Sequence, residues 1–504
     1  MGIPSYYKRL IDSVHGLVRK THPGSIDWLW MDFNCMIYHC LRRPDAPVYP
    51  CADWEKLFVD SVAKYLLHIV NEVKPQKGVY IAIDGVVPMA KMRQQRIRRF
   101  KSSWLAQNGL SEGGGGWDTN SITPGTQFME VLRKRLEVLC AKHSTGKLKF
   151  ILSSSNEPGE GEHKLMDMWR LENTTDTYAV YGLDADLIVL SLLNAGNNPV
   201  WLFREQIESG VVLRDAVGDE FYCWLSIDQL RTHIQGQIGD HSIDEYCFAM
   251  SVLGNDFLPA SLSFKMRDDG HDALLECLQT LQIPLLSKSN EINWIGLESL
   301  ISWLASSEES RIERFIGKKI AMSHNYVGLP LGDNNWPLEQ KEEATLMMGK
   351  RLSPNWRTQY YQQWLGGDDN RRTLCANYIY GIQWIWSYYR GLNENICFNW
   401  FYSEGLPPLW SDLLNYIQKD IIGAFPGTVR IRREDIRPIE QLCLVLPLES
   451  WHLLGSNREK ELVQKAPWLF PESFGFSSVG KRFFWECEAD IPVPSICEVK
   501  AILG

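Results

Sequence analysis

A repeated pattern in the first half of the sequence constrains the fold most. Each unit is a short apolar run, then an acidic residue, then a helical or loop segment, and such runs predict buried parallel strands. The runs are Trp28 to Met31 before Asp32, Val79 to Ile83 before Asp84, Phe150 to Leu152 before the loop of Glu160, Tyr178 to Leu183 before Asp184, and Phe248 to Leu253 ahead of Asp256. Alternating strands and helices predict a doubly wound, mainly parallel α/β sheet. Because ligands of such sheets bind at the carboxyl ends of the strands, we expect these acids to meet in one crevice.

The length of the chain predicts more than one domain. Its 504 residues exceed the ~250 to 300 at which a single core stops growing. From about Ser263 the sequence changes to long amphipathic segments rich in Trp and Tyr, such as Tyr378 to Tyr389. We therefore expect an α/β domain over residues 1–262 and a mainly helical region over residues 263–504. The run Ser111 to Gly116, SEGGGG, predicts a flexible loop tip between elements of the first domain.

Composition predicts a folded, intracellular protein. No apolar stretch approaches the ~20 residues that span a bilayer, and the first ten residues hold no apolar signal core. The twelve cysteines are scattered singly, as in proteins of reducing compartments. We expect a cytoplasmic protein, with the nucleus left open. A net charge of −9 means that any nucleic-acid site must be a local basic patch.

Seven acids are the candidate metal ligands. Two pairs are spaced i, i+2, in PGEGEHK and GLDADLI, and in an extended segment that spacing puts both carboxylates on one side. Carboxylates sharing one cleft repel and raise their own pKa values, and divalent cations such as Mg²⁺ relieve the conflict. Two such ions about 4 Å apart promote in-line displacement at a phosphodiester. The alternative is that each acid is only a strand-end or turn residue. The set is Asp32, Asp84, Glu160, Glu162, Asp184, Asp186 and Asp256.

A basic helix is predicted between the second acid and the glycine-rich run, in AKMRQQRIRRFK. Lys91, Gln95, Arg98 and Arg99 fall at i, i+4, i+7 and i+8 and therefore share one face. Such a face suits a terminal phosphate, which carries more charge than an internal diester. The alternatives are a solvated basic face or a localisation signal. Single strands also need aromatic rings for stacking, and the chain has 20 Trp, of which most must belong to the core.

These residues lie in blocks that match a known family. The blocks are MGIPSYYKRL, LWMDFN, YIAIDGVVPMAKMRQQRIRRF, WDTNSITPGTQFM, NEPGEGEHKLM, YGLDADLIVL, FREQ and VLGNDFLP, followed by YIYGIQWIWSYYRGL, RPIEQLCLVLP and VGKRFFWECEADIP. In this order the sequence resembles the XRN-type 5′→3′ exoribonucleases almost from end to end. Long blocks in a fixed order are far more specific than an isolated motif.

The resemblance implies a nuclease core similar to flap endonucleases over residues 1–262, with residues 263–504 completing and capping the active site. It also implies processive hydrolysis of decapped or otherwise 5′-monophosphorylated single-stranded RNA to nucleoside monophosphates. Two ions are expected, Mg²⁺ with Mn²⁺ as the alternative, and no membrane partner. By position the seven acids would bind the metal, and Lys91, Gln95, Arg98 and Arg99 would bind the 5′ phosphate. Trp384 would be the base-stacking tryptophan.

Three departures from the family pattern stand out. Tyr38 occupies the position of a stacking histidine, and the neighbouring His39 is the alternative for that role. The segment after the basic helix is short, so the family's helical tower is expected to be truncated. The chain also stops soon after the second conserved region, without the long accessory domains of large members. Two competing functions remain: a flap-type DNA endonuclease, and an inactive relative that only binds RNA ends.

Overall fold

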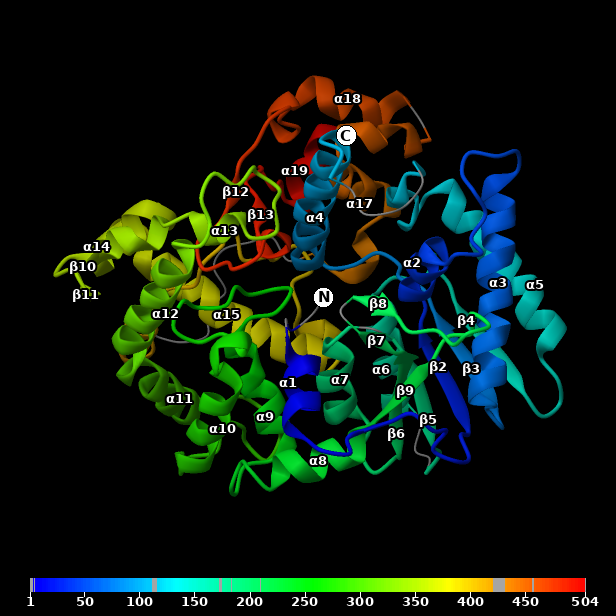
Figure 1. Ribbon diagram of the computed structural model, residues 1–504, viewed down its shortest axis with the longest axis horizontal. Helices are drawn as coiled ribbons and strands as arrows, with labels where there is room; N and C mark the ends of the chain where they lie inside the picture. The colour runs from blue at the N-terminus through cyan, green and yellow to red at the C-terminus, as the bar shows by residue number, and fades with distance from the viewer. Residues whose placement is uncertain are drawn as a thin grey trace.

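The computed structural model describes residues 3, 5–110, 116–171, 175–182, 184–208, 210–419, 431–455 and 457–503. In the described residues a seven-stranded sheet runs in the order β1-β9-β6-β5-β2-β3-β4. Its strands are β1 (Val18–Arg19), β2 (Trp28–Asp32), β3 (Gly78–Ala82), β4 (Lys149–Ser153), β5 (Tyr178–Tyr181), β6 (Val200–Glu205) and β9 (Tyr222–Ser226). Figure 1 shows this sheet on the right of the molecule, with helical layers to its left and above it.

The order of the strands confirms the predicted doubly wound sheet. From β2 the sheet extends through β3 to β4 on one side and through β5 to β6 on the other. All of these neighbours pair in parallel. β9 and β1 close that second edge in antiparallel pairing. The direction of winding therefore reverses between β2 and β5, which is the point where ligands of such sheets bind. Asp32 ends β2 at this point, and Asp184 follows β5.

Side chains alternate between the two faces of the sheet, as strand geometry requires. Leu29 and Met31 of β2 pack with α2 (Asn34–Arg42), α3 (Trp54–Val73) and α5 (Gln127–His143). Trp30, between them, packs on the opposite face with α6 (Gly161–Leu171) and α7 (Asp186–Asn194). In Figure 1, α3 and α5 cover the outer side of the sheet and α6 lies on the inner side. Both faces are thus buried, which accounts for the apolar runs in the sequence.

The predicted helical region is confirmed. It holds α10 (Gly270–Thr280), α11 (Trp294–Ser306), α12 (Glu308–Ser323), α13 (Trp336–Glu339), α14 (Trp356–Trp364), α15 (Arg371–Tyr389), α16 (Trp410–Lys419), α17 (Pro438–Val445), α18 (Asn457–Lys465) and α19 (Ile496–Leu503). α15 contains the Trp- and Tyr-rich segment. One buried apolar cluster includes residues from Ile3 to Val499, so the helical region and the inner face of the sheet share a core. The boundary between residues 262 and 263 stays a prediction. Among the described helices, none is long and apolar enough to cross a membrane.

Two expectations from the sequence are wrong. Phe248 to Leu253 is not a strand: it belongs to the end of α9 (Ile243–Ala249) and to the 3₁₀ turn η2 (Met250–Leu253). The reason is a capping box upstream, in which Ser242 and Glu245 satisfy each other's backbone N–H groups and start a helix. The two i, i+2 acid pairs are also not in extended segments, because each lies at the start of a helix. The predicted loop tip falls almost entirely on residues 111–115, outside the described residues.

Candidate active site

The structure brings the seven predicted acids to one edge of the sheet from separate elements. Asp32 ends β2 and Asp84 follows β3. Glu160 precedes α6, and Glu162 lies in the first turn of that helix. Asp184 precedes α7, which begins at Asp186, and Asp256 lies in the loop after η2. Four of the acids stand at two helix N-termini, where the helix dipole favours negative charge.

Electrostatic interactions join the seven carboxylates into one cluster. Burial, with the carboxylates of Asp84 and Asp184, raises the pKa of Asp32 well above its usual value. Burial and the nearby Asp186 do the same to the pKa of Glu162. Burial and Asp256 raise the pKa of Asp186 to about 7.

Burial also raises the pKa of Glu160, against the opposing charge of Lys91. Burial is the largest cause of each rise, and neighbouring carboxylates add to it. The pKa of Asp184 is lowered instead, because nearby positive charge that includes Lys91 outweighs its burial.

Lys91 of α4 (Met89–Gln107) is the cation inside this cluster. Its ammonium lies 2.7 Å from the Glu160 carboxylate and 2.8 Å from that of Asp256. Although burial opposes its charge, Asp256 and Glu160 raise the pKa of Lys91 well above the usual value. Within the described residues, the charge of Lys91 offsets only part of the negative charge of the seven acids.

The arrangement suits divalent cations. Glu162 Oε2 and Asp186 Oδ1 are buried and have no hydrogen-bond partner in the described part of the chain. A buried carboxylate oxygen without a partner is costly unless a cation binds it. Gly161 keeps the space open, because a Cβ there would lie 2.5 Å from Asp32 Oδ1 and 2.8 Å from the carbonyl oxygen of Ala82. The oxygen-rich donor set is the kind that Mg²⁺ prefers.

We expect Lys91→Met to lower the stability of the metal-free protein. Removing the ammonium leaves Glu160 and Asp256 without their cation, and breaking a buried pair costs about 3 kcal/mol or more. Thermal unfolding with and without Mg²⁺ would measure the effect, and the rise in Tm on adding Mg²⁺ should be larger in the variant than in the wild type. Equal rises in the two proteins would contradict this electrostatic role.

The predicted basic face of α4 divides into buried and exposed members. Gln95 is buried and accepts a hydrogen bond from Gln441 of α17. Arg99 is also buried, its Nη1 has no partner in the described residues, and burial lowers its pKa to about 10, so it stays protonated at neutral pH. Arg98 is exposed. Lys91 points into the acids, and Arg98 is the exposed member of the four.

The other basic side chains of α4 serve the fold. Arg96 is almost fully buried and donates to the backbone carbonyls of Leu444, Leu469 and Pro492. Lys101 donates to backbone carbonyls of the segment 484–487. These contacts fix the C-terminal region on α4, and neither Arg96 nor Lys101 belongs to the predicted phosphate-binding set.

The structure distinguishes Tyr38 from His39. The ring of His39 is buried and lies 3.0 Å from the carboxylate of Glu220, within a network that includes Tyr65 and Glu205. Tyr38 is partly exposed and lies close enough to Arg99 to act on the pKa of its guanidinium, which burial lowers and Tyr38 raises. Of the two, Tyr38 is therefore the residue that faces the predicted phosphate-binding set.

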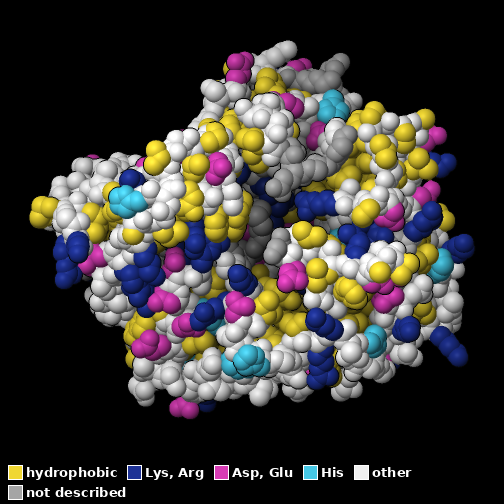
Figure 2. All heavy atoms as spheres, viewed as in Figure 1, with side chains coloured by type: hydrophobic (Ala, Val, Ile, Leu, Met, Phe, Trp, Pro, Cys, Tyr) yellow, Lys and Arg dark blue, Asp and Glu magenta, His cyan; other side chains and the backbone are white. Residues whose placement is uncertain are grey.

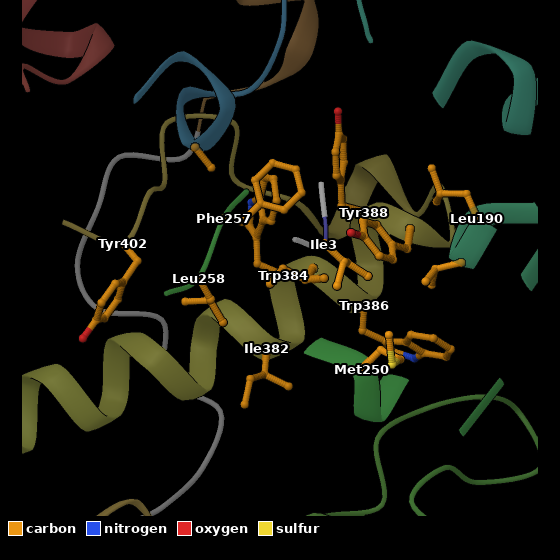
Figure 3. Close-up of a cluster of buried hydrophobic side chains, with 14 of the residues drawn as sticks. Ile3, Leu190, Met250, Phe257, Leu258, Ile382, Trp384, Trp386, Tyr388 and Tyr402 are labelled. Carbon is orange, nitrogen blue, oxygen red and sulfur yellow. The ribbon is translucent and has the colours of Figure 1, made fainter. Parts of the chain in front are cut away.

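Trp384, the predicted base-stacking residue, is buried among other aromatic rings. Its ring is only 2% exposed, and its indole N–H donates to the carbonyl oxygen of Cys397. Phe257, Tyr388 and Trp400 pack around it, with ring centroids 4.9 to 5.2 Å away. Figure 3 shows Phe257 lying against Trp384. In this structure both faces of the Trp384 ring are buried by the side chains that pack around it.

Sequence reasoning missed three residues that shape the acidic site. Tyr388 donates a hydrogen bond to Glu160 and stacks on His163, with ring centroids 3.8 Å apart. Burial lowers the pKa of His163 well below its usual value, which keeps the imidazole neutral. Asn34 donates to Asp84. His163 adjoins Glu162 in the sequence and Tyr388 follows Trp384 by one helical turn, but only the packing of α15 against α6 shows that they meet.

The fold and the site together define an α/β protein with a buried acidic site, suited to divalent cations, at the switch point of its sheet. Comparison with family models then identifies the family. The description "XRN 5'-3' exonuclease N-terminus" matches residues 1–206, and "Xrn1 helical domain" matches residues 338–498. The chain belongs to the XRN 5′-3′ exonuclease family.

Curated relatives align with nearly the whole chain. It is 24% identical to 5'-3' exoribonuclease 2 of Candida albicans over 95% of this chain and 68% of that protein. It is 25% identical to 5'-3' exoribonuclease 1 of Homo sapiens over 98% of this chain but only 33% of the human protein. The chain therefore spans from one third to about two thirds of the length of these two relatives. Among solved structures, the catalytic core of Rad2 in complex with DNA is similar at a TM-score of 0.35 and 12% identity, covering 72% of this chain and 96% of that one.

Proposed function

We propose that this chain is a processive 5′→3′ exoribonuclease that hydrolyses 5′-monophosphorylated single-stranded RNA to nucleoside monophosphates. The observation that carries the proposal is the meeting of seven acids from separate elements beside the basic helix α4, in a member of the XRN family. Relatives named 5'-3' exoribonuclease support the direction and the RNA substrate.

The acids would hold two divalent ions, Mg²⁺ with Mn²⁺ as the alternative. When bound, these ions supply the attacking hydroxide and stabilise the leaving oxygen of an in-line displacement. Glu162 and Asp186 are first among the proposed ligands, because each keeps a buried oxygen without a hydrogen-bond partner in the described residues. Tyr388 orients Glu160 by donating to it, and Asn34 orients Asp84 in the same way.

The basic residues of α4 would position the 5′ end. Arg99 is protonated and Arg98 is exposed, so both suit a terminal phosphate. Lys91 lies seven residues before Arg98, about 10 Å along a helix. A phosphate held at Arg98 and Arg99 therefore leaves room for one nucleotide before the acids, which agrees with the release of single nucleotides. Tyr38, beside Arg99, is the proposed stacking partner of the first base.

A flap-type DNA endonuclease is the weaker alternative. Such enzymes bind duplex DNA with a glycine-rich helical hairpin after the last acid. Here residues 257–265, after Asp256, contain no helix, and the next elements are the 3₁₀ turn η3 (Met266–Asp268) and α10.

Incubating the protein with Mg²⁺ and a 5′-monophosphorylated RNA should release nucleoside monophosphates, and a chelator should abolish the release. Chromatography of the products distinguishes single nucleotides from oligonucleotides, and the same RNA with a 5′ hydroxyl is the matched control substrate. Faster cleavage of a flapped DNA duplex than of the RNA would favour the alternative. Metal-dependent release from neither substrate would refute the nuclease function.

A further inference from the structure

A large cavity lies beside the acidic cluster, between the α/β domain and the helical region. Its volume is about 600 Å³, and its wall comes from α4, the loop of Asp256, α12 and the C-terminal segment 479–488. Asp256 and Arg98 line it, so it adjoins both the acids and the predicted phosphate-binding set. Figure 2 shows a hollow near the middle of this face with Lys and Arg side chains around it.

The wall of the cavity combines apolar and basic groups. Ile97, Phe257, Leu258 and Phe315 are among its apolar members. Its lining includes nine Lys or Arg residues against five Asp or Glu residues. Arg98, Lys318 and Arg482 are the exposed cations among them, although the chain as a whole carries a net charge of −9. Local positive charge with apolar contact surface suits a single-stranded nucleic acid, whose phosphates and bases need both.

Trp485 lies in this lining with 48% of its surface exposed. Its ring is nearly parallel to that of Phe483, at 17° and 6.2 Å between centroids. The guanidinium of Arg267 lies over both rings, at 4.8 Å from Phe483 and 5.5 Å from Trp485, and an ion pair with Glu486 holds it there. The indole is thus held in place by its neighbours while much of its surface stays open.

We propose that this cavity binds the substrate strand on the 3′ side of the scissile phosphate, and that Trp485 stacks on a base of that part. The inference rests on the proposed exonuclease function. The 5′ end of the RNA would stop at the predicted phosphate-binding set. Only the 3′ part of the strand would therefore continue toward solvent. The exposed side chains of Trp485, Arg482 and Lys318 line the cavity where it opens to solvent. Trp485 would supply a stacking surface for this 3′ part of the strand.

The test compares the binding of 5′-monophosphorylated RNAs of increasing length. The proteins carry Asp186→Asn, so that the RNA stays intact, and fluorescence anisotropy measures Kd without any need for activity. Lengthening the RNA from two to eight nucleotides should tighten binding, and Trp485→Ala should weaken binding of the octamer about tenfold, the loss of one stacked base. The dinucleotide, which lacks the 3′ part of the strand that is proposed to contact Trp485, should bind equally to both proteins. Trp485→Phe should restore most of the affinity.

The matched control is Trp468→Ala, which removes a tryptophan of 57% exposure that does not line the cavity. It should leave all the Kd values unchanged. Equal affinity of the Trp485→Ala protein for the octamer, or an equal loss with the dinucleotide, would overturn the inference. A wild-type protein that binds RNA in this length-dependent way but releases no nucleotide would instead refute the proposed function and leave the strand-binding site intact.

Discussion

Asp186→Asn is expected to reduce nucleotide release by about a thousandfold while leaving RNA affinity within about twofold of the wild type. Asp186 is buried at the first residue of α7, and its Oδ1 has no hydrogen-bond partner in the described residues. The amide keeps the shape of the side chain but removes the negative charge that a divalent cation needs. Loss of metal binding at one ligand forfeits several kcal/mol of transition-state stabilisation, and each 1.36 kcal/mol is a factor of ten in rate.

Single-turnover measurement with saturating RNA isolates this effect from binding. Asp60→Asn is the matched control, because Asp60 lies on α3, is partly exposed and pairs with Arg135. It should keep full activity. Higher Mg²⁺ concentrations should recover part of the lost rate in the Asp186→Asn protein if the variant weakens metal binding. A variant with near-normal activity would remove Asp186 from the metal site.

The acidic cluster was predictable from the sequence because neighbouring residues in the chain show where its acids lie. Asp32 and Asp84 each follow a run of buried apolar residues, and strands of a parallel sheet all end at the same edge. The pairs around Glu160 and Asp184 were placed correctly for a wrong reason. Their spacing was read as extended, whereas each pair spans the start of a helix, and it is the helix start that turns both carboxylates toward the sheet edge.

What the sequence could not provide is contact between distant segments. The Phe248 to Leu253 run is a separate case: it is apolar enough for a strand, but the local capping box of Ser242 and Glu245 starts a helix before it. Trp384 and Trp485 both lie in blocks that resemble the family. Phe257 and Trp400 pack against Trp384 and bury it, whereas Trp485 lines a cavity with 48% of its surface exposed. Lys91 shares a helical face with Arg98, but its position among the acids follows from the packing of α4 against the sheet edge.

Arg98→Ala should reduce the preference for a 5′ phosphate over a 5′ hydroxyl by about tenfold. A charge-assisted hydrogen bond contributes roughly 1.5 to 3 kcal/mol, and the substrate without the phosphate never forms it. The ratio of kcat/KM values for the two RNAs reports this contact alone, because any general loss of activity cancels. Arg98 is exposed, so its removal leaves no void in the core. The control is Arg135→Ala, which removes a partly exposed arginine of α5 and should leave the ratio unchanged. If the Arg98→Ala protein keeps the wild-type ratio, the terminal phosphate must bind elsewhere than on this face of α4.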